Sequence, residues 1–367
     1  MNTILSQLLE NYFLNNIASL KLLEQVILGL IQVRTVNLTE LALSIGGSAK
    51  HSSLYRKLQR FFAKFKLSSP SLAKLLVKIA KIQEEKWLLA MDRTNWKFGQ
   101  ISINILVLSI CWKGIAIPII WDFLEKEGTS NNLERQRLLN RFISIFGVDK
   151  IIALLADREF IGDLWLSFLE EQKILFYIRI KENITIGRNN GELVTANHLV
   201  KKLKKGEEIV LRGKRYLGKN YKGPKVSISA LRNEEGELVI IATNDNPHIA
   251  LKTYKRRWEI ETLFGCLKTK GFNFEKTHLK DLDRINTLLG IVSIAFTFAY
   301  VVGIWQNEIS PIKDKTHGRK SISFFRYGLD YLRRILLLPE KMKQEFDEIM
   351  EIFIKPLLYN PREKPSC

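Results

Sequence analysis

The sequence predicts an α/β fold, in which a core of mixed sheet and helices lies between two largely helical regions. The 367 residues allow two or three domains at roughly 150 residues each. Hydrophobic residues at 46% and charged residues at 26% match an ordinary globular protein and exclude wholesale disorder and collagen. Short apolar runs near the centre of the chain predict strands, and apolar residues at helical spacing toward both ends predict helices.

Residues 1–80 are expected to form a helical N-terminal DNA-binding region. Apolar residues recur at helical spacing in LLEQVILGLIQV and in SLYRKLQRFFAKF, and Gly46-Gly47 predicts a turn between two helices. The second of these helices carries Arg56, Lys57 and Arg60 on its polar side, where they could lie against a DNA backbone or groove. A solvated basic face on a structural helical hairpin explains the same pattern equally well.

Residues 81–181 are expected to form the first part of the core. Three apolar runs, KWLLAMD, ISINILVLSICW and IAIPIIWD, predict consecutive strands in an antiparallel meander. A helix over 132–146, the strand IIALLA, a helix near 161–172 and the strand ILFYIRI follow. The order of three strands, helix, strand, helix and strand is that of ribonuclease H-like cores.

A basic, β-rich segment is expected to interrupt this core. Residues 182–246 contain short apolar runs broken by Gly and Asn-Asp turns and are predicted to be an inserted β-rich subdomain. Residues 201–225 include ten Lys or Arg and only two Glu. This excess favours a surface that binds the phosphates along a nucleic-acid backbone over a merely solvated face. The first of these basic residues are Lys201, Lys202, Lys204 and Lys205. Residues 247–310 are expected to complete the core, and residues 311–367 to form a C-terminal helical region.

The net charge and the cysteines indicate the kind of partner and the cellular compartment that the sequence favours. Lys and Arg outnumber Asp and Glu by 57 to 38, and the net charge of +19 points to a polyanionic partner, nucleic acid or an anionic membrane surface. Three cysteines without ligand spacing support neither a disulfide framework nor a zinc site and fit a reducing cytoplasm.

The uncharged segment 285–305 is long enough to span a bilayer. Its polar residues, and the lack of a second such segment, favour a buried helix, so no membrane partner is expected.

Four apolar runs end in an acid and therefore hold a carboxylate at the rim of the sheet, where it can coordinate a hard cation. The four acids are Asp92, Asp122, Asp157 and Asp245. The pattern alone does not choose among them. In a ribonuclease H-like core the first strand and the strand after the first helix are parallel neighbours, which favours Asp92 together with Asp157.

A predicted helix over about 250–270 carries a second polar set. At about 100° per residue, Tyr254, Arg257, Glu261 and Lys268 share one narrow face beside the apolar stripe. Glu259 falls well away from that face and is expected to be solvated. A salt-bridged surface explains such a set as readily as a functional site does.

The spacing of that set resembles the signature of a known family. YKRRWEIETLFGCLK contains Y-x2-R-x3-E-x6-K, which resembles the YREK signature of DDE transposases from bacterial insertion sequences of the insertion-sequence-four type. The segments MDRTNWKFG, LLADREFIG and FRYGLDYLRR resemble the same family's other blocks. The resemblance covers roughly residues 30–335.

The resemblance implies a ribonuclease H-like catalytic core and cut-and-paste DNA chemistry. It assigns the catalytic, metal-binding triad to Asp92, Asp157 and Glu261. It assigns phosphate contacts near the cleaved end to Tyr254, Arg257 and Lys268. The implied cofactors are two Mg²⁺ or Mn²⁺ ions, because three converging carboxylates repel each other and bind hard cations. The implied partners are double-stranded DNA, as inverted-repeat ends and target, and a second copy of the chain on DNA, in the nucleoid of a bacterial cytoplasm.

One feature departs from the family, and two other functions stay open. Relatives that cut through a hairpin can stack an insertion-domain Trp on a flipped base, but residues 182–246 contain no Trp. Tyr216 or Tyr221 offers another stacking face, and Trp258 is expected to pack. The other functions are a ribonuclease H-like nuclease without strand transfer and a DNA-end-binding protein without chemistry.

Overall fold

A computed structural model describes residues 3–45, 49–98, 101–187, 192–218, 223–316 and 320–358. The chain divides into two compact units, which we call the sheet unit and the helical unit. The sheet unit comprises Gln83–Asn95 and Ile103–Leu263. The helical unit comprises Met1–Ile82, Trp96–Ser102 and Phe264–Cys367. The five predicted domain ranges do not coincide with these two units and stay a prediction.

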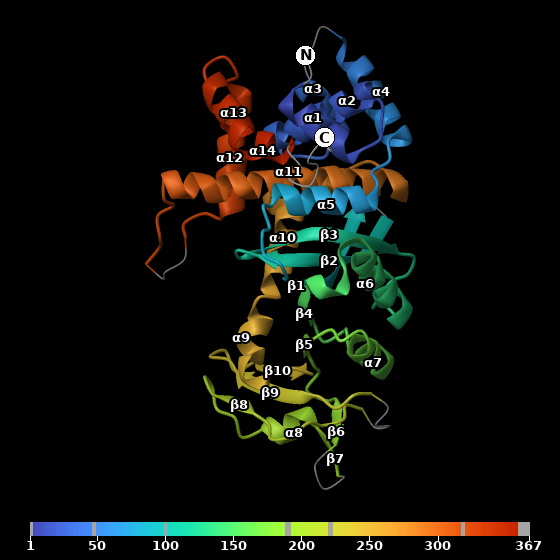
Figure 1. Ribbon diagram of the computed structural model, residues 1–367, viewed down its shortest axis with the longest axis vertical. Coiled ribbons are helices and arrows are strands. Elements are labelled where there is room, and N and C mark those ends of the chain that lie inside the picture. The colour runs from blue at the N-terminus through green and yellow to red at the C-terminus, as the bar shows by residue number, and fades with distance from the viewer. Residues whose placement is uncertain are drawn as a thin grey trace, which may run out of the picture. The chain divides into compact units, whose positions relative to one another are not determined.

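The sheet unit is built on an eight-stranded mixed sheet in the order β3-β2-β1-β4-β5-β10-β9-β8 (Figure 1). Its first strands are β1 (Trp87–Phe98), β2 (Ile101–Trp112), β3 (Ile115–Leu124), β4 (Ile151–Ala156) and β5 (Phe176–Arg179). Strand β4 runs parallel to both β1 and β5, whereas β2 and β3 are antiparallel. This is the strand order of the predicted ribonuclease H-like core, and the predicted α/β fold class is confirmed.

Two helices cover one side of these strands, α6 (Asn132–Phe146) and α7 (Asp163–Glu171) (Figure 1). Helix α6 begins at a capping box, in which Asn131 and Glu134 each accept a hydrogen bond from the other's backbone N–H. Its inner face carries Leu138, Leu139 and Phe142, which are fully buried. The helix predicted over 132–146 therefore forms with the expected bounds, because a cap and an apolar stripe act together.

The range predicted as an inserted subdomain does not form a sheet wholly of its own. Strands β8 (Glu208–Val210), β9 (Ser227–Arg232) and β10 (Leu238–Thr243) extend the main sheet, and β10 pairs with β5. In the described part of this range, only β6 (Thr185–Gly187) and β7 (Leu193–Thr195) form a separate two-stranded sheet, next to the short helix α8 (Ala196–Val200). The unit then continues through a 3₁₀ turn (Pro247–Ile249) into α9 (Ala250–Lys255) and α10 (Trp258–Gly265).

The helical unit is assembled around α11 (Leu282–Ile309). The N-terminal helices are α1 (Ile4–Tyr12), α2 (Ile17–Val33), α3 (Leu38–Ser44), α4 (His51–Lys64) and α5 (Ser69–Ile79). The C-terminal helices are α12 (Phe324–Leu337), α13 (Lys343–Ile349) and α14 (Lys355–Leu358), with a π-helical stretch at Met350–Ile354. A π-helical stretch at Cys266–Lys270 and a 3₁₀ turn at Phe274–Lys276 precede α11.

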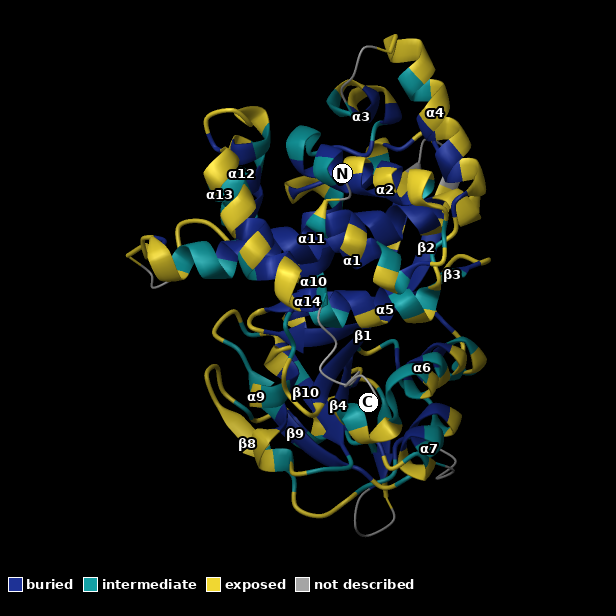
Figure 2. Cartoon of the chain, turned by 45° about the horizontal axis from the view of Figure 1, so that its top comes forward, coloured by how far each residue is buried: buried dark blue, intermediate teal, exposed yellow. Residues whose placement is uncertain are grey.

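Helix α11 contains the apolar segment that is long enough to span a membrane. It is the one helix within the described ranges that passes a length and hydropathy test for a span by itself, and almost all of its apolar window is buried in the protein. Helices α2, α5 and α12 pack against it, and Figure 2 shows its middle as buried. The predicted buried helix is confirmed.

Helices α11 and α12 cross in direct backbone contact. A Cβ atom added at Gly303 would meet the carbonyl oxygen of Phe324, and one added at Gly328 would meet that of Ala299. Only glycine permits this approach, so Gly328, within FRYGLDYLRR, serves helix packing.

Candidate active site

Two of the four acids predicted at strand ends lie side by side in the sheet unit. The parallel register of β1 and β4 pairs Met91 with Ala156, so Asp92 and Asp157 follow at the same level, where the pairing of the two strands ends. Asp157 directly follows β4, but β1 continues to Phe98 and β3 to Leu124, so the strand ends expected at Asp92 and Asp122 are wrong. Asp122 instead forms ion pairs with Arg137 and Arg141 of α6. Asp245 accepts a hydrogen bond of 2.5 Å from the Tyr177 hydroxyl. The arrangement expected for Asp92 and Asp157 is therefore present, and the other two acids are engaged elsewhere.

Asp92 is a partly buried carboxylate with charged groups on several sides. Its Oδ1 accepts a hydrogen bond of 2.7 Å from the backbone N–H of Arg93, and its Oδ2 accepts one of 3.1 Å from Nη1 of Arg257. Burial raises the pKa of Asp92 from 3.8 to about 6, with the negative charges of Asp157 and Glu159 adding to the rise. Arg257 and the Arg93 N–H oppose it. The charge of Asp92 is therefore only partly compensated by its neighbours.

Asp157 provides an unsatisfied oxygen beside Asp92. Its Oδ1 is buried and has no hydrogen-bond partner among the residues that the structure describes. A buried acceptor without a partner costs about 1–3 kcal/mol. This oxygen is therefore the atom of the site that would gain most from a cation.

Arg257 joins three of the residues that the sequence singled out. Its Nε donates to the Tyr254 hydroxyl (3.0 Å), its Nη1 to Asp92 (3.1 Å) and its Nη2 to Glu261 (2.5 Å). Its side chain is 4% exposed. Burial, outweighing the nearby Arg257 charge, raises the pKa of Tyr254 to about 12, so its hydroxyl stays protonated. The structure thus brings Tyr254, Arg257, Glu261 and Asp92 together.

The predicted continuous helix over 250–270 is wrong. Helix α9 ends at Lys255 and α10 begins at Trp258. Between them the N–H groups of Arg256 and Arg257 bond to the carbonyls of Thr253 and Tyr254, three residues back. These tighter turns, followed by π-helix from Cys266, invalidate a wheel of constant 100° steps.

Lys268, the fourth member of the predicted face, belongs to the helical unit. It lies in the π-helical stretch, and its Nζ is 3.9 Å from Oε1 of Glu275. The sheet unit by itself therefore assembles Tyr254, Arg257 and Glu261 without it. Its role as a phosphate contact stays a prediction.

Two neighbours in α10 differ from expectation. Glu259 is buried rather than solvated: it accepts hydrogen bonds from Arg256 (2.9 and 3.4 Å) and from the backbone of Trp112. Trp258, expected to pack, is 58% exposed, and the guanidinium of Arg257 lies 5.5 Å from its ring centroid. Both differences concern exposure: a helical wheel gives the angle of a residue but not which faces of the helix other elements cover, and the end of β2 at Trp112 reaches Glu259.

A clamp between the two acid-bearing segments was not predicted. Arg93 and Glu159 form a bidentate ion pair with two contacts of 3.2 Å. The carbonyl of Glu159 also accepts a hydrogen bond of 2.9 Å from buried Arg135 of α6. Because Arg93 follows Asp92 and Glu159 lies two residues after Asp157, the clamp holds the two acid-bearing segments together. The signal in the sequence was a second charged residue beside each acid, in MDRT and ADREF.

The donor set fits a divalent cation in part. Asp92 and Asp157 supply adjacent carboxylates, and the unpartnered Oδ1 of Asp157 has the chemistry that Mg²⁺ prefers. Across the described part of the chain, however, no three His, Cys, Asp or Glu side chains form a group able to hold a metal ion. Glu261 is bonded to Arg257 instead. The first two acids fit a cation as they stand, and Glu261 does so only after it leaves Arg257.

Residues 124–298 match the family model of the transposase DDE domain. The match covers somewhat less than half of the chain, contains Asp157 and Glu261, and begins after Asp92. It supports a DDE transposase, as the YREK spacing predicted. The insertion-sequence-four subgroup stays a prediction.

Two further comparisons complete the findings. No curated protein matches the chain. Among solved structures, the chain is similar to the piggyBac transposase in a cryo-EM structure of its synaptic complex with hairpin DNA. The identity is 12% and the TM-score 0.47, over 96% of this chain and 78% of that chain.

The basic residues predicted to contact DNA away from the candidate active site are exposed, whereas Tyr254 and Arg257 are buried. On α4, Arg56, Lys57 and Arg60 face outward while Leu58 and Phe62 are buried, and Figure 2 shows this exposed outer face. Arg56 and Arg60 border a shallow hollow of about 610 Å³. The four basic residues after α8 are also exposed: Lys201, Lys202, Lys204 and Lys205. Two tyrosines were candidates for stacking on a base. The ring centroid of Tyr216 lies 5.1 Å from Nζ of Lys225, and Tyr221 lies outside the described residues.

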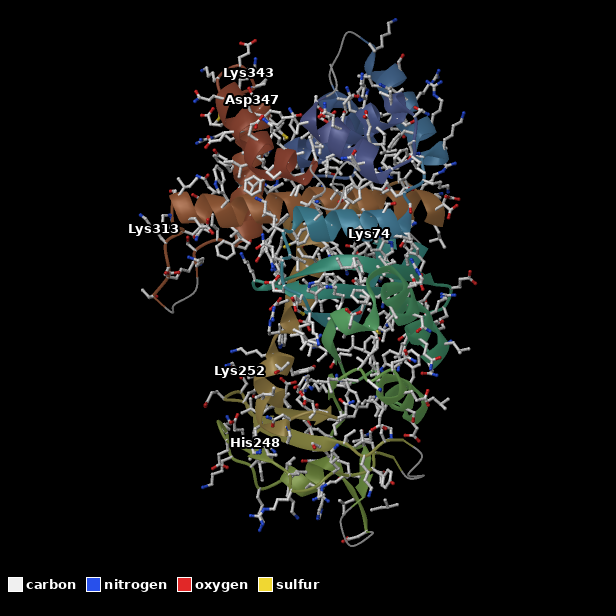
Figure 3. All side chains as sticks on the ribbon, viewed as in Figure 1. Lys74, His248, Lys252, Lys313, Lys343 and Asp347 are labelled. Carbon is white, nitrogen blue, oxygen red and sulfur yellow. The ribbon has the colours of Figure 1, made fainter. Side chains whose placement is uncertain are left out.

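A second basic hollow lies in the sheet unit near the start of α9. It has a volume of about 460 Å³, and its lining includes Arg212, Lys214 and His248. Figure 3 labels His248 in this region together with Lys252 of α9. The basic character of the 201–225 segment thus extends to the turn before the candidate site.

Proposed function

We propose that the protein is a DNA transposase that cuts at the ends of its own insertion sequence and joins the resulting 3′-OH ends to target DNA. The observation that carries the proposal is that Asp92 and Asp157 lie at the same level, directly after the paired segments of the neighbouring parallel strands β1 and β4, with Arg257 linking Asp92 to Glu261. The transposase DDE match over residues 124–298 supports it, as does the net charge of +19.

We assign catalysis and cation binding to Asp92, Asp157 and Glu261. Two bound divalent cations, Mg²⁺ or Mn²⁺, would activate water or a 3′-hydroxyl and stabilise the leaving oxygen of the phosphodiester. In the protein as described, Arg257 neutralises part of the charge of Asp92 and Glu261. Glu261, 38% exposed, is the carboxylate that can exchange this partner most readily, whereas the Asp92 side chain is only 16% exposed.

Binding of DNA phosphates is assigned to Arg257, Tyr254 and Lys268 near the cleaved end. Once released from Glu261, the guanidinium of Arg257 can bind a phosphate through two hydrogen bonds. The ammonium of Lys268 would act on the phosphate as a point charge. The exposed basic residues of α4 and of the segment after α8 contact the DNA backbone further away. The partners are inverted-repeat ends and target DNA, bound by two copies of the chain in the nucleoid of a bacterial cytoplasm.

The test uses purified protein, Mg²⁺ and duplex DNA carrying the inverted repeats that flank its own gene. Wild type is expected to break both strands at the element boundary. Asp92→Asn and Asp157→Asn are expected to abolish cleavage and to leave DNA binding nearly unchanged, because affinity comes mainly from basic contacts. Asp122→Asn is the matched control, since it removes the same charge from a strand acid that is paired with Arg137 and Arg141, and it is expected to stay active.

A second substrate separates this proposal from its rivals. With a pre-cleaved end, a transposase joins the 3′-OH to target DNA, whereas a nuclease only degrades it. Joining that is lost in Asp92→Asn supports the proposal. Binding of ends without any cutting or joining by wild type would instead identify a DNA-end-binding protein.

A further inference from the structure

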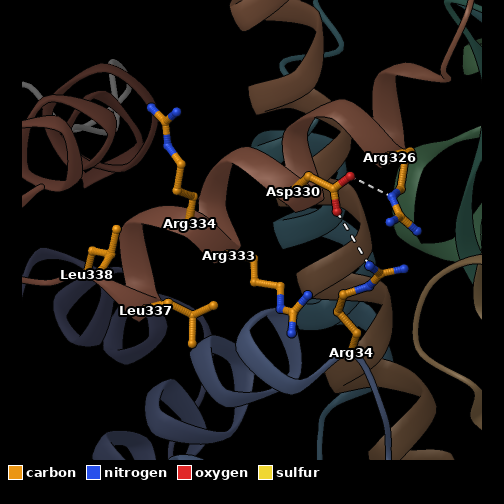
Figure 4. A pocket seen from close by; sticks show the side chains of 7 residues that line it. All are labelled: Arg34, Arg326, Asp330, Arg333, Arg334, Leu337 and Leu338. Carbon is orange, nitrogen blue, oxygen red and sulfur yellow. Dashed lines mark hydrogen bonds and ion pairs between the residues drawn. The ribbon is translucent and has the colours of Figure 1, made fainter.

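A cluster of arginines lies in the helical unit, on one face of α12 and at the end of α2. Arg326, Asp330 and Arg333 are spaced by four and three residues on α12, so they share one face of the helix. Arg34 follows the last residue of α2 in a left-handed conformation with φ 60°. Figure 4 shows the side chains of Arg34 and Arg326 converging on Asp330, with Arg333 on the same side of α12. We call Arg34, Arg326 and Arg333 the α12 arginine cluster.

The positive charge of this cluster is only partly compensated. Asp330 accepts hydrogen bonds from Nε of Arg326 (2.6 Å) and Nη1 of Arg34 (3.5 Å). Arg333 donates its Nε to the backbone carbonyl of Gln32 (2.9 Å), not to an acid. Among the described residues of the cluster, Asp330 is thus the ion-pair partner of Arg34 and Arg326, whereas Arg333 bonds to a neutral backbone carbonyl.

Arg34 shows the strain of this crowding. Its Nε is buried and has no hydrogen-bond partner among the described residues. Burial lowers the pKa of Arg34, and the charges of Arg326 and Arg333 lower it further, against the opposing effect of Asp330. A buried donor without a partner, close to uncompensated positive charge, is the setting in which an anion gains most.

The cluster borders an open hollow of about 550 Å³, whose far wall includes Leu337 and Leu338. Arg326 and Asp330 are both nearly half exposed, so a ligand can reach them from solvent. One carboxylate would occupy one guanidinium fork, whereas successive phosphates of a nucleic acid offer separate pairs of oxygens to several forks.

We propose that the α12 arginine cluster binds backbone phosphates of double-stranded DNA, as a contact additional to those of the candidate active site. The inference rests on the proposed transposase function, which supplies the DNA. Asp330 then acts as a stand-in for phosphate, because it holds Arg34 and Arg326 in place until the DNA binds.

The test measures the affinity of the full chain for duplex DNA as a function of salt concentration. Arg326→Gln/Arg333→Gln is expected to weaken binding and to reduce the slope of log affinity against log salt by about 2, roughly 0.9 for each lost phosphate contact. Asp330→Asn is expected to change binding in the opposite direction. It frees two guanidiniums and removes a repelling charge, so affinity rises several-fold.

Two controls separate binding from folding and from net charge. Lys74→Gln/Lys343→Gln removes two exposed positive charges elsewhere in the helical unit and is expected to change the slope by less than half as much; Figure 3 labels both lysines. Thermal unfolding is followed for every variant, because Arg333→Gln breaks the bond to Gln32. If the double arginine variant does not fold, Asp330→Asn decides, since a merely structural acid would not raise DNA affinity on removal.

The outcomes distinguish this inference from the proposed function. Suppose that wild type binds and cuts its ends, and that Arg326→Gln/Arg333→Gln and Asp330→Asn both keep the wild-type affinity and salt slope for DNA. The cluster is then not a DNA contact, and the transposase proposal stands. If wild type binds no duplex, the proposed function fails first. If inorganic phosphate raises the melting temperature in wild type but not in the double variant, and DNA binding is unchanged, the cluster serves a free anion and the DNA assignment is overturned.

Discussion

Replacing each of the two glutamates of α10 with alanine tests the local structure of the site most directly. Glu259 accepts hydrogen bonds from Arg256 and from the backbone N–H of Trp112. Glu261 has one ion pair, with Arg257, and is 38% exposed. Although only two residues separate them, the structure predicts opposite consequences for stability and for catalysis.

The magnitude for Glu259→Ala follows from the two donors that it leaves behind. The Trp112 N–H lies in a buried strand end, and a buried donor without a partner costs about 1–3 kcal/mol. The Arg256 pair adds about 0.5 kcal/mol, because that side chain is 43% exposed and water replaces the carboxylate. Part of this loss is offset, since burial raises the pKa of Glu259 and its charge is itself costly in the fold. We expect a net loss of about 2 kcal/mol in the free energy of unfolding.

Glu261→Ala is expected to cost only about 0.5 kcal/mol. Arg257 keeps Asp92 and Tyr254 as partners, and the exposed position is easily solvated. Its effect falls on chemistry instead, because the proposed function makes Glu261 a cation ligand. Cleavage and joining should both be lost.

Urea unfolding of both variants, with cleavage measured on one end substrate, decides the matter. The expected pattern is a destabilised but active Glu259→Ala and a stable but inactive Glu261→Ala. A change below about 0.5 kcal/mol for Glu259→Ala, the usual value for a surface substitution, would refute the buried position of this carboxylate. An active Glu261→Ala would remove Glu261 from the triad.

Three more predictions follow from particular residues. Asp92 has a folded pKa raised to about 6, so without divalent cations its contribution to stability is present below pH 3.8 and is lost as the pH rises through 6. The loss is up to about 3 kcal/mol in the free energy of unfolding. Urea unfolding of wild type and Asp92→Asn should therefore give free energies that diverge between pH 3.8 and 6. A difference that stays constant over this pH range would contradict the raised pKa of Asp92. A double-mutant cycle of Arg93→Gln and Glu159→Gln should give a coupling of about 1–2 kcal/mol, whereas additive effects would show that the clamp contributes nothing. Changing four exposed lysines to glutamine should flatten the salt dependence of DNA binding, by about 0.9 in slope for each lost contact. The four are Lys201, Lys202, Lys204 and Lys205. An unchanged slope would show that they form only a solvated face.

Elements whose signals lie within a few residues of one another are predictable from the sequence. Helix α6 has its predicted bounds because Asn131, Glu134 and the apolar stripe are all local. Strands β1 to β5 follow from apolar runs between turns, and their order places Asp92 beside Asp157 through a parallel pairing that the chain topology requires.

Features that depend on residues far apart in the chain become visible only in the folded protein. Strands β8 to β10 extend the main sheet because β10 finds β5 as its partner, and no local pattern encodes the choice of a neighbouring strand. Glu259 is buried because its carboxylate reaches the backbone of Trp112, in a strand that lies well over one hundred residues earlier. Arg257 reaches Tyr254 and Glu261 at spacings of three and four residues, whereas its bond to Asp92 joins residues 165 positions apart. Backbone pairing and burial are properties of distant neighbours, so the helical wheel grouped Tyr254, Arg257 and Glu261 correctly but gave no sign that Glu259 is buried.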